Sequence, residues 1–159
     1  MIRKMKACDQ EAVLALQNTG WTKVSSPVYD RQWTLVDLEE NIKRGMSFYV
    51  LEEAQQVVGV IDFGPYYSFP AGRHVATFGI LIKEGYQNKG YGSLLMQAVI
   101  EEAKAQGYEK LALHVMGENH TAIHFYHKHG FKEEARLTKA FKIDNHYVDG
   151  LILAKDLEE

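Results

Sequence analysis

Apolar and polar positions alternate in two stretches of the first half of the chain, as they do in half-buried strands. Residues 47–52 and 57–64 alternate around a short turn at residues 53–55, and we expect them to pair as a hairpin. Residues 74–83, HVATFGILIK, are rich in β-branched and aromatic side chains and predict a mostly buried strand. Another apolar run predicts a strand over residues 110–116.

The two ends of the chain predict the remaining strands. Residues 1–6 favour a first strand. Residues 140–143 and 146–153 favour two strands joined by a turn at Asp144 and Asn145.

Helical spacing of apolar residues is present in three stretches before residue 107. The stretch after Asp9 predicts a first helix, with Asp9 as its cap. Residues 35–44 predict a second helix, capped by Thr34 and ended by Gly45. A third, longer helix ends at Gly107, where glycine suits the C-terminal turn.

This order of elements predicts a single domain over residues 1–159, with one mixed sheet and helices on both of its faces. A chain of 159 residues with 46% hydrophobic content can bury a sizeable core. No internal repeat, low-complexity tract or linker argues for a second domain.

Charge and cysteine content exclude several classes of protein. The formal net charge is -3 and no long basic run is present, which argues against a nucleic-acid partner. Apolar runs fall short of the ~18 residues that a membrane helix needs, and the N-terminus lacks the apolar core of a secretory signal. Cys8 is the one cysteine, so no internal disulfide forms. We expect a cytoplasmic protein with no membrane partner.

The run QNKGYG at residues 87–92 joins the strand at residues 74–83 to the third helix. The first backbone N–H groups of a helix lack intrahelical partners, and the helix dipole adds partial positive charge there. Gly90 and Gly92 remove side chains that would hold a diphosphate away from these donors, and Lys89 adds a mobile positive charge. Neither a Walker loop nor a complete dinucleotide fingerprint is present. The run therefore predicts a pyrophosphate-binding turn.

A second motif follows the strand at residues 110–116. Asn119 comes first, then a helix that carries Ala122 and Tyr126, and then a glycine and a phenylalanine at residues 130–131. Asn119 through residue 131 reads N-x-x-A-x-x-x-Y-x-x-x-G-F. The two motifs together cover residues 75–131, and their joint occurrence by chance is improbable.

The pair of motifs resembles the signatures of the GCN5-related N-acetyltransferase (GNAT) family, whose first pattern, Q/R-x-x-G-x-G/A, is matched by Gln87, Gly90 and Gly92. The resemblance implies an α/β (α+β) fold, the GNAT acyl-CoA acyltransferase fold. In it, a mixed, mostly antiparallel central sheet is flanked by helices, and the parallel fourth and fifth strands splay apart to admit acetyl-CoA. It implies direct transfer of the acetyl group to a primary amine in a ternary complex.

The resemblance also implies contacts with acetyl-CoA (the cosubstrate) or coenzyme A. The strand backbone would pair with the pantetheine arm and stabilise an oxyanion, the glycine turn would bind the diphosphate, and Asn119 would bond the arm from the other edge. The implied cofactor-binding residues are Ile80, Leu81, Ile82, Gln87, Asn88, Lys89, Gly90, Tyr91, Gly92, Ser93, Asn119 and Tyr126.

Tyr126 is the expected catalytic acid. The leaving thiolate benefits from a proton donor at sulfur, and a phenol of pKa near ~10 suits that task. The alternative is a tyrosine that packs its ring in the core beside Ala122 and Phe131. Packing and catalysis can coexist.

The general base stays unassigned at this point. Many members of the family use a glutamate on the fourth strand, but the matching region at residues 77–79 has no carboxylate. Asp62, His74, His114 and Glu118 are the possible substitutes. For both histidines a structural role is the simpler interpretation.

Several aromatic residues and one acidic residue are candidates for binding the acceptor. They suit a cationic amine, although each also suits ordinary packing: Trp21, Tyr29, Asp30, Trp33, Tyr66, Tyr67 and Phe69. The acceptor, a small-molecule amine or a peptide, stays open, as does a homodimer.

The sequence is compatible with three other interpretations. A noncatalytic acyl-CoA sensor or interaction domain would keep the cleft without turnover, and the missing glutamate favours it mildly. A protein that binds ATP lacks an evident magnesium ligand set. His120, His124 and His127 share a helical face, but no cysteine or HEXXH pattern completes a metal site, so we expect no metal.

Overall fold

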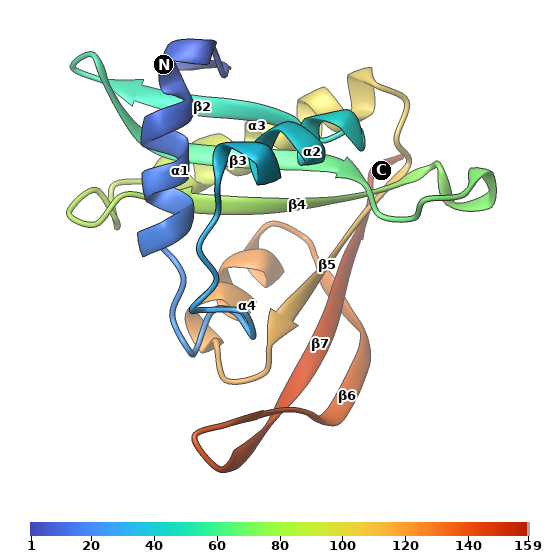
Figure 1. Ribbon diagram of the computed structural model, residues 1–159. Coiled ribbons are helices and arrows are strands. Elements are labelled where there is room, and N and C mark those ends of the chain that lie inside the picture. Colours follow the sequence, from blue (N-terminus) through green and yellow to red (C-terminus); the bar gives the residue numbers. More distant parts are fainter. Residues whose placement is uncertain (159) are drawn as a thin grey trace.

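The computed structural model describes residues 1–158, and its seven strands form one sheet in the order β1-β2-β3-β4-β5-β7-β6 (Figure 1). The strands are β1 (Ile2–Lys4), β2 (Ser47–Glu53), β3 (Gln56–Pro65), β4 (Val75–Ile82), β5 (Lys110–Met116), β6 (Lys132–Ile143) and β7 (His146–Asp156). The helices are α1 (Gln10–Thr19), α2 (Leu35–Lys43), α3 (Tyr91–Ala105) and α4 (His120–Lys128), with short 3-10 turns η1 (Ala7–Asp9) and η2 (Pro70–Gly72).

The β4 and β5 strands are the one parallel pair in a sheet whose other neighbours are antiparallel, which confirms the expected mixed topology. They pair only at Val75 with Lys110 and at Ala76 with Leu111. Beyond these two positions the strands separate, as Figure 1 shows between β4 and β5. The expected splay is therefore present, and most of the β4 edge that faces β5 has no strand partner.

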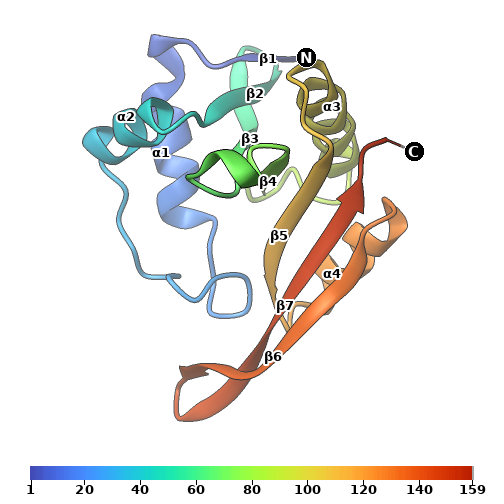
Figure 2. The same cartoon turned by 90° about the vertical axis from the view of Figure 1, so that its right-hand side faces the viewer.

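Helices cover both faces of the sheet, as the sequence predicts (Figure 2). One core lies between the sheet and α1 and α2, with Val13, Leu38 and Leu81 among its buried residues. The larger core lies on the α3 and α4 side, with Phe78 and Leu95 among its members. Side chains of β4 thus alternate between two cores, as a strand buried on both faces requires.

The last two strands are longer than the sequence predicts. β6 begins at Lys132, eight residues before the expected start at residue 140. Almost all of its side chains are exposed, because β6 is the edge strand and β7 alone pairs with it. An edge strand with solvated faces does not need alternating apolar side chains. The sequence therefore gives no pattern from which this part of the strand could be predicted.

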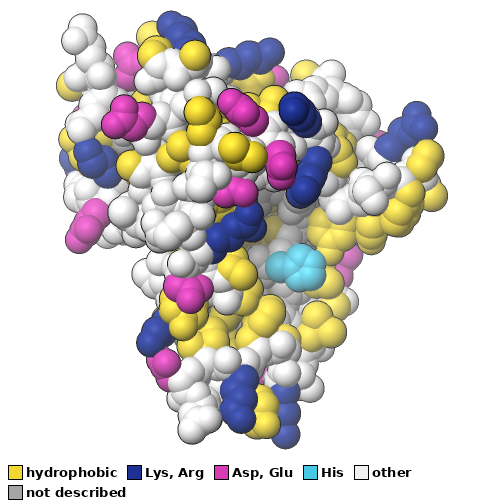
Figure 3. All heavy atoms as spheres, in the orientation of Figure 1, with side chains coloured by type: hydrophobic (Ala, Val, Ile, Leu, Met, Phe, Trp, Pro, Cys, Tyr) yellow, Lys and Arg dark blue, Asp and Glu magenta, His cyan; other side chains and the backbone are white. Residues whose placement is uncertain are grey.

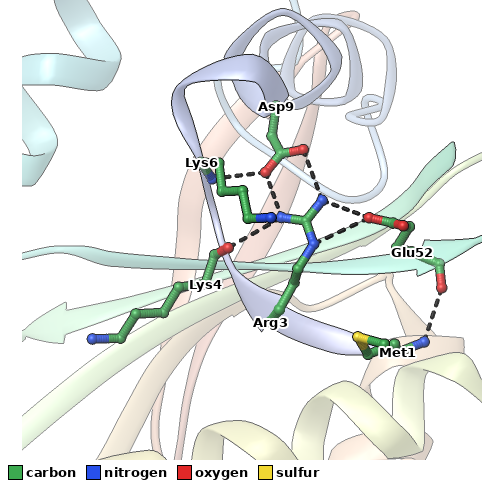
Figure 4. A network of polar contacts seen from close by, with 6 residues as sticks. All are labelled: Met1, Arg3, Lys4, Lys6, Asp9 and Glu52. Carbon is green, nitrogen blue, oxygen red and sulfur yellow. Dashed lines mark hydrogen bonds and ion pairs between the residues drawn. The ribbon is translucent and has the colours of Figure 1, made fainter. Parts of the chain in front are cut away.

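A polar network fixes the start of the chain to the sheet (Figure 4). The guanidinium of Arg3 on β1 donates to the buried carboxylate of Asp9 at 2.6 Å and also to the carboxylate of Glu52 on β2. The backbone N–H of Lys6 donates to the same Asp9 carboxylate at 2.7 Å. The expected capping of α1 by the Asp9 side chain is wrong, since these partners occupy the carboxylate and Asp9 caps the preceding η1 turn instead. Arg3 lowers the pKa of Asp9.

The remaining predicted boundaries agree with the structure to within about two residues. α2 begins after Thr34, whose hydroxyl accepts from the backbone N–H of Asp37 in the expected cap. Gly45 follows its end with φ +101°, a backbone conformation that glycine adopts without strain. The β2–β3 hairpin turns at Ala54 and Gln55, as expected.

Candidate functional site

The turn before α3 has the geometry of an anion site. Gly90 is the N-cap of α3 with φ +82°, and Asn88 also has positive φ, at 62°. The first intrahelical bond runs from the N–H of Leu94 to the carbonyl of Gly90, so the donors of the preceding helical residues are free. No atom lies within 4 Å of the position that a Cβ of Gly90 would occupy. Free N–H groups at a helix start beside an uncrowded glycine suit a diphosphate.

Neighbouring contacts hold this turn in place. The hydroxyl of Tyr91 donates to the carboxylate of Glu53 at the end of β2, and Ser93 Oγ lies 3.2 Å from Nε2 of His129. A Cβ at Gly92 would lie 3.4 Å from the ring of Phe125 on α4, so Gly92 also allows α4 to pack close to the turn. Lys89 Nζ lies 5.1 Å from the ring centroid of Tyr86.

The β4 backbone presents alternate residues to the gap between β4 and β5. The carbonyl of Val75 accepts from the N–H of Tyr66, just after β3, and the N–H of Lys83 donates to the carbonyl of Val58 on β3. Because an antiparallel ladder uses every second residue, Leu81 bonds toward β3, whereas Phe78, Ile80 and Ile82 face the gap. Of the three residues expected to pair with pantetheine, Ile80 and Ile82 therefore have backbone groups directed at the gap.

Two residues of the second motif border the gap on the other side. The side-chain oxygen of Asn119 accepts from the N–H of Ala122 at 3.3 Å and caps α4, which leaves its amide NH₂ group available to a ligand. The ring of Tyr126 makes edge contacts with Phe78 and Phe131, at centroid distances of 5.8 and 5.6 Å. Packing therefore fixes the direction of the Tyr126 side chain.

The ring of Tyr126 is partly buried, and its hydroxyl makes no hydrogen bond within residues 1–158. No side-chain polar atom in this part of the chain is both buried and unpartnered. Burial first, and then the negative charge of Asp62, raise the pKa of Tyr126 to about 12. The phenol consequently stays protonated throughout the physiological range.

A cavity of about 220 Å³ lies between the α1–α2 layer and the sheet. Figure 3 shows this face, which is hollowed between the α1–α2 layer and the half of the molecule that carries β5 to β7. Its floor is formed by Asp62 on β3 and by Thr77, Phe78 and Gly79 on β4, and most of its walls are apolar. Phe78 connects the cavity to Tyr126, so a molecule in the cavity lies next to the gap between β4 and β5.

A family model described as the Acetyltransferase (GNAT) family matches residues 11–131. The chain belongs to this family. The acetyltransferase is 28% identical over 158 residues to the putative phosphinothricin acetyltransferase YwnH of Bacillus subtilis, covering 94% of each protein. It is 25% identical over 115 residues to the L-amino acid N-acyltransferase MnaT of Escherichia coli, covering 72% of this chain and 67% of MnaT.

Solved structures agree with this assignment. The crystal structure of smu.2055 from Streptococcus mutans superimposes with a TM-score of 0.94 at 37% identity, covering 99% of each chain. An N-acetyltransferase from Staphylococcus aureus has a TM-score of 0.87 at 28% identity, covering 99% of this chain and 98% of that one. The expected fold is confirmed, and so is the resemblance stated from the two motifs. The chain is an acetyl-CoA-dependent N-acetyltransferase, not a sensor without turnover.

Only one of the four candidate bases of the acetyltransferase lines the cavity. Asp62 does so, whereas His74 is exposed ahead of β4. His114 is exposed on β5, with Nε2 2.8 Å from the Tyr66 hydroxyl. Glu118 is exposed and bonds to His146 at 3.1 Å. His114 lies on the face opposite to its buried neighbours, and its ring stacks on that of Tyr66 at a centroid distance of 5.9 Å.

The aromatic acceptor candidates divide into separate groups. Trp21 and Trp33 line the cavity. Tyr66, Tyr67 and Phe69 instead pack together before β4, the first pair edge to face and the second tilted, with centroid distances of 4.7 and 5.0 Å. Tyr29 packs in a small cluster with Met116, and Asp30 is exposed. None of these last residues lines the cavity.

Some cavity residues carry no signal in the sequence. Gln17 and Asn41 come from α1 and α2, Met46 precedes β2, and Phe48 lies near the start of β2. Each looks like an ordinary helix or core residue, because the cavity depends on how the helices pack on the sheet. His120, His124 and His127 are all exposed, and no group of three potential metal ligands occurs among the described residues. Within residues 1–158, no helix is long and apolar enough to cross a bilayer.

Proposed function

We propose that this acetyltransferase acetylates the primary amine of a small molecule held in the cavity over Asp62 and Gly79. The cavity position carries the proposal, since β4 residues with a mostly unpaired edge form its floor and one of them, Phe78, contacts the ring of Tyr126. A volume of about 220 Å³ is below the ~300–1,000 Å³ of common ligand pockets, which favours a small acceptor over a long peptide.

Each part of acetyl-CoA has a matching surface in this proposal. The diphosphate binds the N–H groups and Lys89 of the turn that runs from Gln87 to Ser93. The pantetheine arm pairs with the backbone of Phe78, Ile80 and Ile82, with Asn119 on the opposite side. One of the β4 amides stabilises the oxyanion, a contribution of about 3 kcal/mol for a single donor.

Tyr126 donates a hydrogen bond, and then its proton, to the leaving sulfur. A pKa of about 12 keeps the Tyr126 hydroxyl protonated. The same high pKa makes complete transfer of the proton to a thiolate, whose ordinary pKa is ~8.5, unfavourable. Part of this cost comes from the negative charge of Asp62. Neutralisation of that carboxylate during the reaction therefore makes Tyr126 a better acid.

Relatives narrow the acceptors to test. They are named as acting on L-amino acids, on L-methionine sulfoximine and sulfone, and on spermidine N(1). An amino acid needs a cation for its carboxylate. Arg31 is one candidate, since its exposed guanidinium lies 4.1 Å from the ring centroid of Trp33, a cavity residue, and 3.5 Å from the carboxylate of Asp37.

Release of free thiol from acetyl-CoA tests the proposal across a panel of L-amino acids, polyamines, simple alkylamines and short peptides. We expect acceptor-dependent release with a small primary amine. If an amino acid is the acceptor, Arg31→Ala raises its KM, and the activity on alkylamines stays within about twofold; Lys23→Ala, at an exposed ion pair elsewhere on the loop, is the control. No release with any amine, or release with peptides alone, would contradict the proposal.

A further inference from the structure

Asp62 is unusual in its surroundings. It is the one ionisable side chain among the residues that line the cavity, and within residues 1–158 it forms no ion pair. Walls of Trp21, Leu38 and Phe48 surround it instead. An unpaired carboxylate in an apolar cavity is costly, so its presence calls for a partner that comes from outside the chain.

The sheet register explains how Asp62 reaches this position. Asp62 on β3 lies directly opposite Gly79 on β4, and its side chain lies over the glycine. A Cβ at Gly79 would lie 2.9 Å from Oδ1 of Asp62, so any larger residue there would displace the carboxylate. The missing side chain on β4 therefore makes room for a carboxylate that comes from the next strand.

We propose that Asp62 binds the ammonium group of the acceptor and removes its proton before attack on acetyl-CoA. This assignment rests on the proposed function. It replaces the strand-four glutamate that this chain lacks at residues 77–79 with a carboxylate that projects over the same strand. His74, His114 and Glu118 lie outside the cavity lining, and the last two have hydrogen-bond partners in Tyr66 and His146.

The protons balance over the resulting steps of the reaction. The Asp62 carboxylate takes one proton from the ammonium, and the freed nitrogen lone pair forms the N–C bond to the thioester carbonyl. Collapse of the tetrahedral intermediate breaks the C–S bond, and the sulfur receives the Tyr126 proton. The second proton of the nitrogen restores Tyr126, and Asp62 releases its proton to solvent. The ammonium thus loses two protons, one to solvent and one to the coenzyme A thiol.

Asp62 is the group in this site that titrates near neutral pH, and its charge acts on Tyr126. Burial raises the pKa of Asp62 to about 7, close to the value that suits a general base at neutral pH. Tyr126 from α4 is the titratable group whose pKa depends on the Asp62 charge. The cavity residues from α1, α2, β2 and β4 are uncharged. The pH dependence of the reaction between pH 6 and 8 is accordingly attributed to Asp62.

The test compares the wild type with Asp62→Asn, using the best amine from the acceptor panel. We expect kcat/KM at pH 7 to fall by about 10²- to 10⁴-fold, the range for loss of a general base. The loss shrinks as the pH approaches the pKa of the amine, because solvent then supplies the free amine. With a fluorinated alkylamine that is already unprotonated at pH 7, we expect Asp62→Asn to lower kcat/KM much less. Glu118→Gln is the matched control, and we expect its pH profiles of kcat/KM to match those of the wild type with both amines.

Gly79→Ala provides a second variant that keeps the carboxylate but moves it. We expect a loss of kcat/KM in the same direction, while the thermal shift produced by coenzyme A stays as in the wild type for both variants. An Asp62→Asn enzyme within threefold of the wild type at every pH, or equally impaired with both amines, would overturn the assignment. A wild type that acetylates no amine contradicts the proposed function itself, so the two failures are distinguishable.

Discussion

Single residues in this molecule set both its chemistry and its pH dependence, and Asp62 is the clearest case. Its pKa of about 7 in the folded state exceeds the ordinary 3.8, so the unfolded chain binds fewer protons between these values. Stability therefore falls as the pH rises from about 4 to 7, by at most about 4 kcal/mol. Asp62→Asn removes this titration. We expect the variant to unfold at a higher temperature than the wild type at pH 8, with the two melting temperatures converging near pH 4.

Thermal melts of both proteins across this range, followed by circular dichroism, measure the effect. A difference between the two that is independent of pH would contradict the raised pKa.

The proposed role of Tyr126 depends on its hydroxyl group alone. Tyr126→Phe keeps the ring contacts with Phe78 and Phe131 and removes only the hydroxyl. We expect kcat to fall by about 10²- to 10³-fold, because the donor to the leaving sulfur is lost. Melting temperature and the thermal shift with coenzyme A stay close to the wild-type values. An unchanged kcat would exclude Tyr126 as the acid.

At the scale of elements, the two ends of α3 offer a matched comparison. Gly90 and Gly107 have φ of +82° and +88°, and neither has an atom within 4 Å of a Cβ position. Alanine at either site costs about 1–2 kcal/mol through backbone strain. Only Gly90→Ala is expected to weaken coenzyme A binding, since only that end presents free N–H groups to the diphosphate. Calorimetric titration of both variants checks this, and equal affinities would contradict the anion site.

The β4 edge gives a prediction at the same scale. Amides that face the gap, those of Phe78, Ile80 and Ile82, have no strand partner, whereas Gly79 and Leu81 bond to β3. We expect coenzyme A to slow hydrogen exchange at the first group far more than at the second. Residue-resolved exchange by NMR distinguishes them. Uniform protection along β4 would be inconsistent with this alternation.

How far the sequence predicts the molecule also depends on the element. β4, β5 and the glycine turn could be located because buried strands and helix starts restrict side-chain and backbone choice. β6 could not be located, because its solvated edge tolerates almost any residue.

Single residues differ in the same way. Tyr126 lies in a spaced motif, and its contacts follow from that motif. Asp62 was one of four candidates, and only the cross-strand register with Gly79 distinguishes it. Asp9 looked like a cap, but the long-range partner Arg3 determines its contacts.

For the whole molecule, cosubstrate binding and stability are linked. A ligand that fills the gap contacts β4 on one side and α4 on the other, and it binds the folded state only. At a concentration 100-fold above Kd we expect about 2.7 kcal/mol of added stability. Thermal unfolding with increasing coenzyme A measures this, and the absence of any shift would contradict the cofactor site.

The two-residue contact between β4 and β5 also bears on how the protein unfolds. β1 to β4 come from one continuous part of the chain, residues 2–82, and β5, β7 and β6 come from another, residues 110–156. Backbone pairing is therefore almost complete within each part, and the shared core on the α3 and α4 side is the main connection between them. We therefore expect partial unfolding of the C-terminal part, with the N-terminal part still folded, to need less free energy than global unfolding. Such a state separates Tyr126 on α4 from Phe78 on β4, so we expect turnover to be lost before the molecule as a whole has lost its structure.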